Sequence, residues 1–159
     1  MNISFSNPRF VGLATILVLA GASQADADPM HASAKIEVTD YKEQPYGAAI
    51  KDGSNLFELM IQEKFSGDID AIGTVRFLQA RVAGSASFVG MEQVSGSIGG
   101  RKGTFVLQDT GAVKGDDVSG TWIVVPGSGT GDLKGLRGSG GFKAKLGQRA
   151  DVTLDYSFE

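Results

Sequence analysis

The sequence contains no cysteine and a single histidine, His31, among its 159 residues. Without cysteine the chain has no disulfide framework, no thiol nucleophile, no zinc-thiolate site and no lipoprotein anchor. One histidine leaves little room for a histidine metal cluster or a histidine-based acid–base pair. Positive charge is also scarce, because 15 Lys and Arg residues face 18 Asp and Glu residues, for a net charge of -3. A nucleic-acid-binding protein needs a cationic face, so we expect no nucleic-acid partner.

An uncharged apolar run is confined to the N-terminal segment. Residues Phe10–Ala20 form it, and Arg9 precedes it. Its length matches the about 7–15 residues of a secretory signal and falls short of the about 20 that a membrane-spanning helix needs. We therefore expect no membrane span once the signal has been removed.

Small residues follow the apolar run and predict where the signal is cleaved. Ala25-Asp26-Ala27 fits the Ala-x-Ala pattern, and Ser23-Gln24-Ala25 is a second candidate. Cleavage after Ala27 predicts a signal peptide over residues 1–27 and one domain over residues 28–159, in the periplasm or secreted. The alternative is that Met30 is the true first residue and that the segment before it is not part of the protein.

The rest of the chain shows the alternation of strands and lacks the periodicity of helices. Glycine, at 23 residues, is abundant, and it marks the turns between apolar runs together with Asp, Ser and Pro. Eight strands are predicted, at Ser33–Tyr41, Leu56–Phe65, Ile69–Val82, Ser87–Ile98, Thr104–Ala112, Val118–Val125, Gly135–Lys145 and Asp151–Phe158. Gln44–Asn55 has weaker strand character and is interpreted as a loop or a short helix over one mouth.

Short turns between consecutive strands predict an antiparallel meander, which hides its edges by packing two sheets or by closing into a barrel. Glycines inside the strands favour closure, because a small barrel bends its strands sharply at corners. The expected fold is therefore all-β, a single eight-stranded antiparallel barrel similar to lipocalins.

Several stretches resemble a bacterial family of small proteins of unknown function that is placed with the allene oxide cyclase-like barrels. The matching stretches are FSGDI (65–69), ASFVGME (86–92), GTFVLQ (103–108), GTWIVVPGSGTGDLKGLRGSGGF (120–142) and TLDYSFE (153–159). GTGDLKGLRG is also similar to a signature of plant allene oxide cyclases and dirigent proteins. The resemblance implies an eight-stranded antiparallel barrel and assigns no activity. Two positions depart from the family pattern: Asp109, where a histidine is expected, and Arg76, where an acidic residue is expected before Phe77.

Polar and aromatic side chains stand in otherwise apolar strands and are the candidate site residues. Alternate residues of a barrel strand point inward, where a polar group needs a partner or a ligand. Five residues are predicted to bind a ligand. Glu92 and Gln108 would form a polar anchor, and Phe77, Trp122 and Tyr156 would form an aromatic wall. Buried Glu92 would have a raised pKa and is the candidate catalytic acid or base. The alternative is that Glu92 faces solvent and Trp122 plugs a filled interior.

Other motifs are interpreted structurally, and no cofactor or metal is expected. The glycines of residues 127–141 lack the following helix of a dinucleotide-binding fingerprint and indicate a wide hairpin at the barrel rim. The pairs Asp68/Asp70 and Asp116/Asp117 have too few carboxylates for a calcium loop. His31 is expected to fray near the terminus, and Arg137 is expected to clamp a carboxylate of the protein.

Three functions are compatible with these features of the sequence, in order of preference. The first is a binding protein that holds one small apolar ligand in its barrel. The second is an isomerase or cyclase that acts by confining its substrate, with Glu92 as acid or base. The third is a structural or interaction protein that assembles as a homo-oligomer through an apolar outer face.

Overall fold

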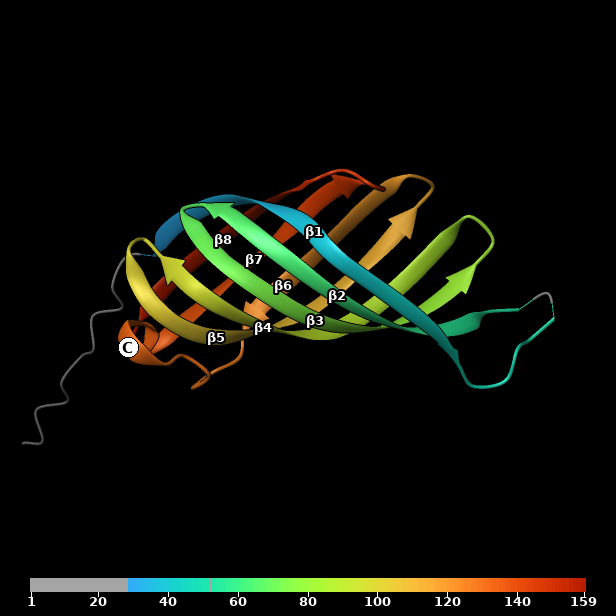
Figure 1. Cartoon of the computed structure of the whole chain (residues 1–159), viewed down its shortest axis with the longest axis horizontal. Helices are drawn as coiled ribbons and strands as arrows, with labels where there is room; N and C mark the ends of the chain where they lie inside the picture. The colour runs from blue at the N-terminus through green and yellow to red at the C-terminus, as the bar shows by residue number, and fades with distance from the viewer. Residues whose placement is uncertain (1–28, 52) are drawn as a thin grey trace, which may run out of the picture.

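The computed structural model describes residues 29–51 and 53–159, and these form a closed barrel of eight antiparallel strands. The strands follow one another around the barrel in chain order, with β8 paired to β1 (Figure 1). They are β1 (Met30–Tyr46), β2 (Asn55–Gly67), β3 (Ile69–Val82), β4 (Ser85–Ile98), β5 (Arg101–Lys114), β6 (Asp117–Val124), β7 (Leu136–Lys145) and β8 (Ala150–Phe158). The prediction of eight strands closed into a barrel is confirmed. The predicted signal peptide lies outside the described residues.

Strand β1 is longer than the sequence indicates. It begins at Met30 and runs to Tyr46, so the segment expected to be a loop or a short helix starts with strand. A register shift between Val38 and Asp40 marks a bulge. Within the described chain, β8 pairs with β1 only from Met30 to Ile36, and β1 then continues beside β2 alone. The β1–β2 ribbon therefore extends past the rest of the barrel (Figure 1).

One half of the interior is filled by a hydrophobic core. Phe65, Val94, Phe105 and Leu154 from four strands are all at most 1% exposed there. The 3-10 helix η1 (Gly131–Leu133), which follows β6, places fully buried Leu133 in the same cluster. This end of the barrel is therefore closed by side chains.

The loop before η1 is tied to β5 by hydrogen bonds. The Thr104 backbone N–H donates to Thr130 Oγ1 at 2.9 Å, and the Val106 N–H donates to Ser128 Oγ at 3.0 Å. Gly103 lets the loop approach, because a Cβ there would lie 2.0 Å from the Thr130 carbonyl oxygen. The glycine-rich segment is thus a cap on the closed end and contains one short helical turn, where the sequence indicated only a hairpin.

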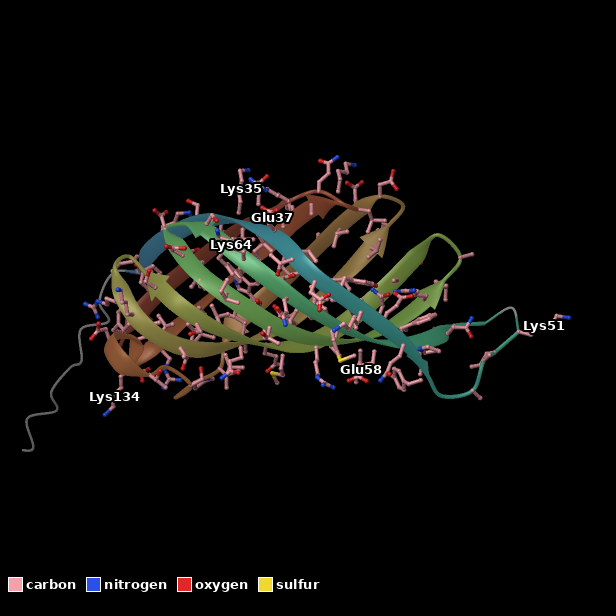
Figure 2. The ribbon with its side chains drawn as sticks, viewed as in Figure 1. Lys35, Glu37, Lys51, Glu58, Lys64 and Lys134 are labelled. Atoms are coloured by element: carbon pink, nitrogen blue, oxygen red, sulfur yellow. The ribbon has the colours of Figure 1, made fainter. Side chains whose placement is uncertain are left out.

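Charged side chains lie mainly on the outside of the barrel. Lys51 projects from the β1–β2 loop, and Lys134 projects from the segment after η1 (Figure 2). Among the described residues, no helix is long and apolar enough to cross a membrane.

Candidate functional site

The other half of the barrel encloses a cavity of about 750 Å³ that opens at one end. The turns after β3, β5 and β7 contribute Gly84, Gly115 and Gly147 to its lining, so the mouth lies at the end opposite to η1. Apolar side chains of β1 and β2, among them Ile36 and Ile61, line one side. This volume lies in the range of small-molecule pockets, about 300–1,000 Å³.

The opposite side of the cavity is a wall of aromatic rings. Phe77, Phe88, Phe142 and Trp122 all line it. The rings contact in sequence around the wall: Phe77 and Phe88 lie edge-to-face with centroids 4.9 Å apart, and Trp122 and Phe142 lie 5.5 Å apart. A continuous aromatic face of this kind suits a flat or apolar ligand.

Each ring of this wall lies over a glycine of the neighbouring strand. The paired positions are Phe77 with Gly90, Phe88 with Gly111, Phe142 with Gly120, and Trp122 with Gly140. A Cβ at any of the first three glycines would lie 2.4 Å from a ring atom of its partner. The strand glycines were expected to bend the barrel at corners. The structure shows that these four make room for aromatic rings that pack flat against the sheet.

Three carboxyl groups lie at the deep end of the cavity, on Glu63 (β2), Glu92 (β4) and Asp109 (β5). Glu92 and Asp109 are each 2% exposed. Glu92 extends over Gly73, where a Cβ would lie 1.9 Å from Glu92 Oε1. Gly73 is the cross-strand partner of Glu63, so this missing side chain lets the Glu92 carboxyl approach Glu63.

The environment of these carboxyl groups favours their protonated forms. Burial raises the pKa of Glu63 to about 7, and burial together with the negative charge of Glu63 raises the pKa of Asp109 to about 7. Burial, followed by the charges of Glu63 and Asp109, raises the pKa of Glu92 well above its usual range. Near neutral pH the cluster therefore holds protons that a solvated carboxylate would have lost.

If the carboxyl groups of Glu63, Glu92 and Asp109 were all ionised, each could only accept hydrogen bonds, and none could donate one to another. Among the described residues, the buried oxygens Glu92 Oε1 and Asp109 Oδ2 have no hydrogen-bond partner. A proton on Glu92 lets this carboxyl donate a hydrogen bond to Glu63. The bond adds to the raised pKa of Glu92, whereas at Glu63 it opposes the larger rise in pKa that burial causes. The deep end of the cavity is thus polar, acidic and incompletely satisfied.

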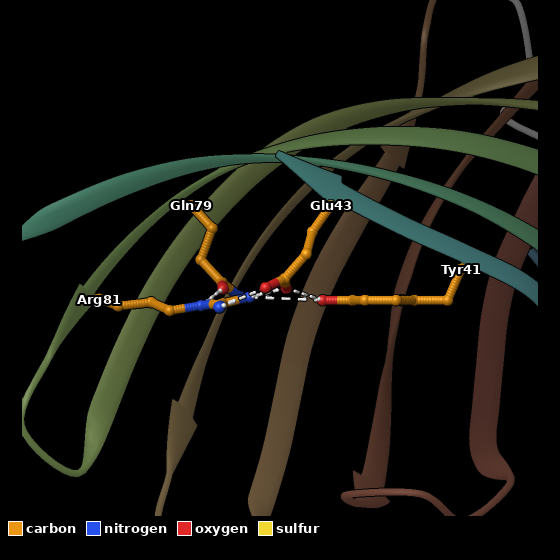
Figure 3. Close-up of polar contacts among 4 residues, drawn as sticks. All are labelled: Tyr41, Glu43, Gln79 and Arg81. Atoms are coloured by element: carbon orange, nitrogen blue, oxygen red, sulfur yellow. Dashed lines mark hydrogen bonds and ion pairs between the residues drawn. The ribbon is translucent and has the colours of Figure 1, made fainter. Parts of the chain in front are cut away.

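A second polar group, formed by Tyr41, Glu43, Gln79 and Arg81, lies near the mouth (Figure 3). The Arg81 guanidinium donates to both Glu43 carboxylate oxygens, at 3.1 and 2.5 Å, and to the Tyr41 hydroxyl at 3.3 Å. It also donates to buried Gln79. The hydrogen bonds from Arg81 to Glu43, followed by one that the Tyr41 hydroxyl donates to Glu43 at 2.5 Å, hold the pKa of Glu43 down at about 2.

The Arg81 guanidinium also lies over the Phe57 ring, 4.1 Å from its centroid. Tyr41 and Glu43 are on β1, whereas Gln79 and Arg81 are on β3. The group therefore ties the extended β1–β2 ribbon to the strand beyond it and fixes one side of the mouth.

The structure brings three of the five predicted ligand-binding residues together. Phe77, Glu92 and Trp122 line the cavity, and Glu92, the candidate acid or base, is buried. The predicted inward orientation of Gln108 is wrong, because Gln108 is exposed and Leu107 and Asp109 on either side are buried. Tyr156 points inward but belongs to the core of the closed half, so it does not extend the aromatic wall.

The cavity residues that were not predicted include two further acids and two further aromatic residues, namely Glu63, Asp109, Phe88 and Phe142. For Glu63 and Asp109, the alternation of inward and outward residues along the strand already indicated that the side chain points inward. Glu63 shares its parity with Ile61 and Phe65, and Asp109 shares its parity with Phe105 and Leu107. Of the two departures from the family pattern, Asp109 faces the cavity, whereas Arg76 is exposed and pairs with Glu58 at 2.7 Å.

Of the remaining motifs, the pair Asp116/Asp117 contributes Asp116 to the mouth of the cavity, whereas His31 and Arg137 lie outside the lining. His31 does not fray: it lies in β1, paired to β8, and its Nδ1 is 2.6 Å from Asp155 Oδ1 on the exposed surface. Arg137 clamps the Glu159 carboxylate at 2.7 Å, as expected of it. Among the residues of 29–51 and 53–159, no group of three or more His, Cys, Asp or Glu side chains has a geometry that could hold a metal ion.

Comparison with known proteins places the chain in a family. The family model described as "Protein of unknown function (DUF3224)" matches residues 32–156, which span all but the ends of the barrel. The chain belongs to this family. The DUF3224 match confirms the resemblance to a bacterial family of unknown function, and the likeness to allene oxide cyclases stays a prediction.

A solved structure of the DUF3224 family has the same fold. It is the crystal structure of a protein with unknown function from Shewanella oneidensis MR-1, 32% identical to this chain, with a TM-score of 0.67. The match covers 83% of this chain and 99% of that chain. A search of curated proteins gives no match.

Proposed function

We propose that this DUF3224 protein binds one small apolar ligand in the open half of its barrel. The observation that carries the proposal is the cavity of about 750 Å³, lined on one side by aromatic rings and on the other by aliphatic side chains. Apolar surface of this kind gains free energy when a ligand replaces water against it, at about 25 cal/mol per Å². A cavity that opens at one end lets such a ligand enter without breaking the strand pairing.

A pair of neighbouring substitutions tests this proposal. Ala86 lines the cavity, whereas Ser87 is exposed on the outer face. Ala86→Phe should fill part of the cavity and weaken binding of apolar probes by tenfold or more, while Ser87→Phe should leave it unchanged. The emission of Trp122, the single tryptophan of the chain, reports occupancy directly. Equal affinity in both variants would place binding outside the cavity and contradict the proposal.

Native mass spectrometry of protein purified from its own host is the second test. A bound small molecule that is retained by the Ser87→Phe variant and lost from the Ala86→Phe variant supports the proposal. A chain without a bound molecule, together with probes that do not change the emission of Trp122, contradicts it.

An isomerase or cyclase is a second candidate function, favoured by one observation. Carboxyl groups whose pKa lies at about 7, as for Glu63 and Asp109, exchange protons readily near neutral pH. Glu92 would act as the acid or base on a substrate held against the aromatic wall. If Glu92→Gln leaves the turnover of an identified substrate unaltered, this role is wrong.

Association of barrels through an outer face is a third candidate. Leu78, Val89, Met91 and Ile123 point outward from β3, β4 and β6 and are about half exposed, between 47% and 55%. A face of this kind favours contact with a second copy. Light scattering tests it: a dimer or trimer that dissociates on Met91→Lys supports association, and a monomer contradicts it.

We also propose that the chain is exported and that its signal peptide is cleaved after Ala27. The support is the order of Arg9, the apolar run and the small residues in the sequence. N-terminal sequencing of the protein from the periplasm or the medium should begin at Asp28. A chain that begins at Met30 and stays in the cytoplasm would contradict export.

A further inference from the structure

The deep end of the cavity carries acidic groups that the protein itself does not neutralise. Glu92 and Asp109 are almost completely buried, line the cavity, and each has one carboxyl oxygen without a partner among the described residues. A buried polar atom without a partner destabilises the folded chain, because it has lost its hydrogen bonds to water. Glu63, from the neighbouring side, adds a third carboxyl group to the same place.

No cationic side chain of residues 29–51 and 53–159 lies within this group. Within the described residues, the cationic side chains that line the cavity are Arg81 and Lys145, and both lie next to the turns at the mouth. Each already has a carboxylate partner: Arg81 binds Glu43, and Lys145 Nζ lies 2.6 Å from Asp117 Oδ1. The described part of the chain therefore leaves the deep acids without a positive charge.

The surroundings of the acids define what else a ligand must be. Between them and the mouth the lining is mainly apolar, with Phe77, Phe88 and Phe142 on one side and Leu59 and Ile61 on the other. A ligand that reaches the acids must therefore carry a hydrophobic body. Its polar group must sit at the inner end of that body.

We propose that the cavity binds a hydrophobic amine, whose protonated nitrogen lies among Glu63, Glu92 and Asp109 and whose apolar body lies against the aromatic wall. This inference rests on the proposed ligand-binding function and names its ligand class. A primary ammonium has three N–H donors and no acceptor, which complements carboxylate oxygens that only accept. The Trp122 ring, which also lines the cavity, presents a face that attracts a cation.

Three alkyl probes of equal length test the inference on the full chain. Octylamine, octanol and octanoate each have eight carbon atoms in a linear chain and differ mainly in their polar group, and Trp122 emission and titration calorimetry report their binding. Octylamine should bind at least tenfold more tightly than octanol at pH 7.5, and octanoate should bind most weakly. The affinity for octylamine should also rise between pH 5 and pH 7, because the ammonium displaces protons from Glu63, Glu92 and Asp109, while the affinity for octanol should stay constant.

Substitutions within the acidic group separate its charge from its shape. Glu92→Gln and Asp109→Asn keep the side-chain volume and should each lower octylamine affinity about tenfold, with less than a threefold change for octanol. Glu37→Gln, which alters an exposed ion pair with Arg149, is the matched control and should change neither affinity. Circular dichroism confirms that each variant is folded, and either interior variant alone suffices for the test.

The outcomes distinguish the failure of this inference from that of the proposed function. If octanol or octanoate binds as tightly as octylamine, the amine inference is wrong, whereas apolar ligand binding stands. If octylamine binds best but both interior variants retain that preference, the amine does not reach the acids and the inference is also wrong. If none of the three probes changes the emission of Trp122, both the inference and the proposed function fail.

Discussion

Replacing Glu92 by Gln should make the protein more stable at neutral pH than the wild type. Gln has the shape of a protonated Glu and carries no charge at any pH. In the folded wild type, burial and two neighbouring acids raise the pKa of Glu92 well above 4.5, the value expected for the unfolded chain. Between those two pKa values the unfolded chain has released a proton that the folded chain retains. The free energy of unfolding of the wild type therefore falls as pH rises above about 4.5.

The size of the effect follows from the number of retained protons. One retained proton changes the free energy of unfolding by about 1.4 kcal/mol per pH unit, or about 2.7 kcal/mol between pH 5 and pH 7. Glu92→Gln removes one such proton, so the difference in stability between variant and wild type should grow in favour of the variant over this window, by up to that amount. Glu63 and Asp109 remain in the variant and keep part of the pH dependence.

Urea unfolding at half-unit steps from pH 5 to pH 8 measures this difference, with Trp122 emission and circular dichroism as probes. Glu37→Gln is the control, because Glu37 is exposed and half of its side chain is open to solvent. Its curve should run parallel to that of the wild type. A Glu92→Gln curve that also runs parallel to the wild type, or a wild-type stability that rises from pH 5 to pH 7, would refute the reasoning.

Three further substitutions have definite expected outcomes. Gly140→Ala places a Cβ 1.9 Å from a backbone carbonyl oxygen of β8 and 2.8 Å from Trp122 Nε1, so it should lower the free energy of unfolding in urea by about 1–3 kcal/mol and shift the tryptophan emission. Leu133→Ala empties a fully buried position at the closed end and should cost about 2–5 kcal/mol by the same measurement. Arg81→Ala removes the main cause of the low pKa of Glu43, which should rise from about 2 towards 4.5 in an NMR titration. In the wild type, ionised Glu43 adds to the free energy of unfolding above pH 4.5, and this contribution is lost as pH falls towards 2. The Arg81→Ala variant should lack this contribution.

Alternation and turn residues were sufficient to predict the strands, because each strand has one buried face. The same alternation placed Phe77, Glu92 and Trp122 on the inner face. It also indicated the correct orientation of Asp109, because Phe105 and Leu107 show that odd-numbered residues of β5 point inward. The prediction of Gln108 as an inward residue was inconsistent with that pattern. The register between neighbouring strands places each aromatic ring opposite a glycine. This register depends on how the strands pair, so it cannot be predicted from the residue pattern of a single strand.

Two features of the site depend on three-dimensional structure and could not be predicted. The bulge between Val38 and Asp40 reverses the parity of β1, so Tyr41 and not Lys42 faces the mouth. An alternation pattern also does not predict how far along the barrel axis an inward-pointing side chain lies. Tyr156 and Trp122 both point inward, yet Tyr156 belongs to the closed half and Trp122 to the border with the cavity.

The pairing of β8 with β1 has a consequence for how the protein folds. Seven residue pairs join these strands, and each pair links positions more than a hundred residues apart. Until this seam forms, any partly assembled sheet has two unpaired edges that can capture another chain. Folding is therefore expected to be slow and all-or-none, since distant segments must meet before the last backbone bonds are made. Substitutions that weaken the seam should act by promoting aggregation during folding, before they alter the cavity of molecules that have already closed.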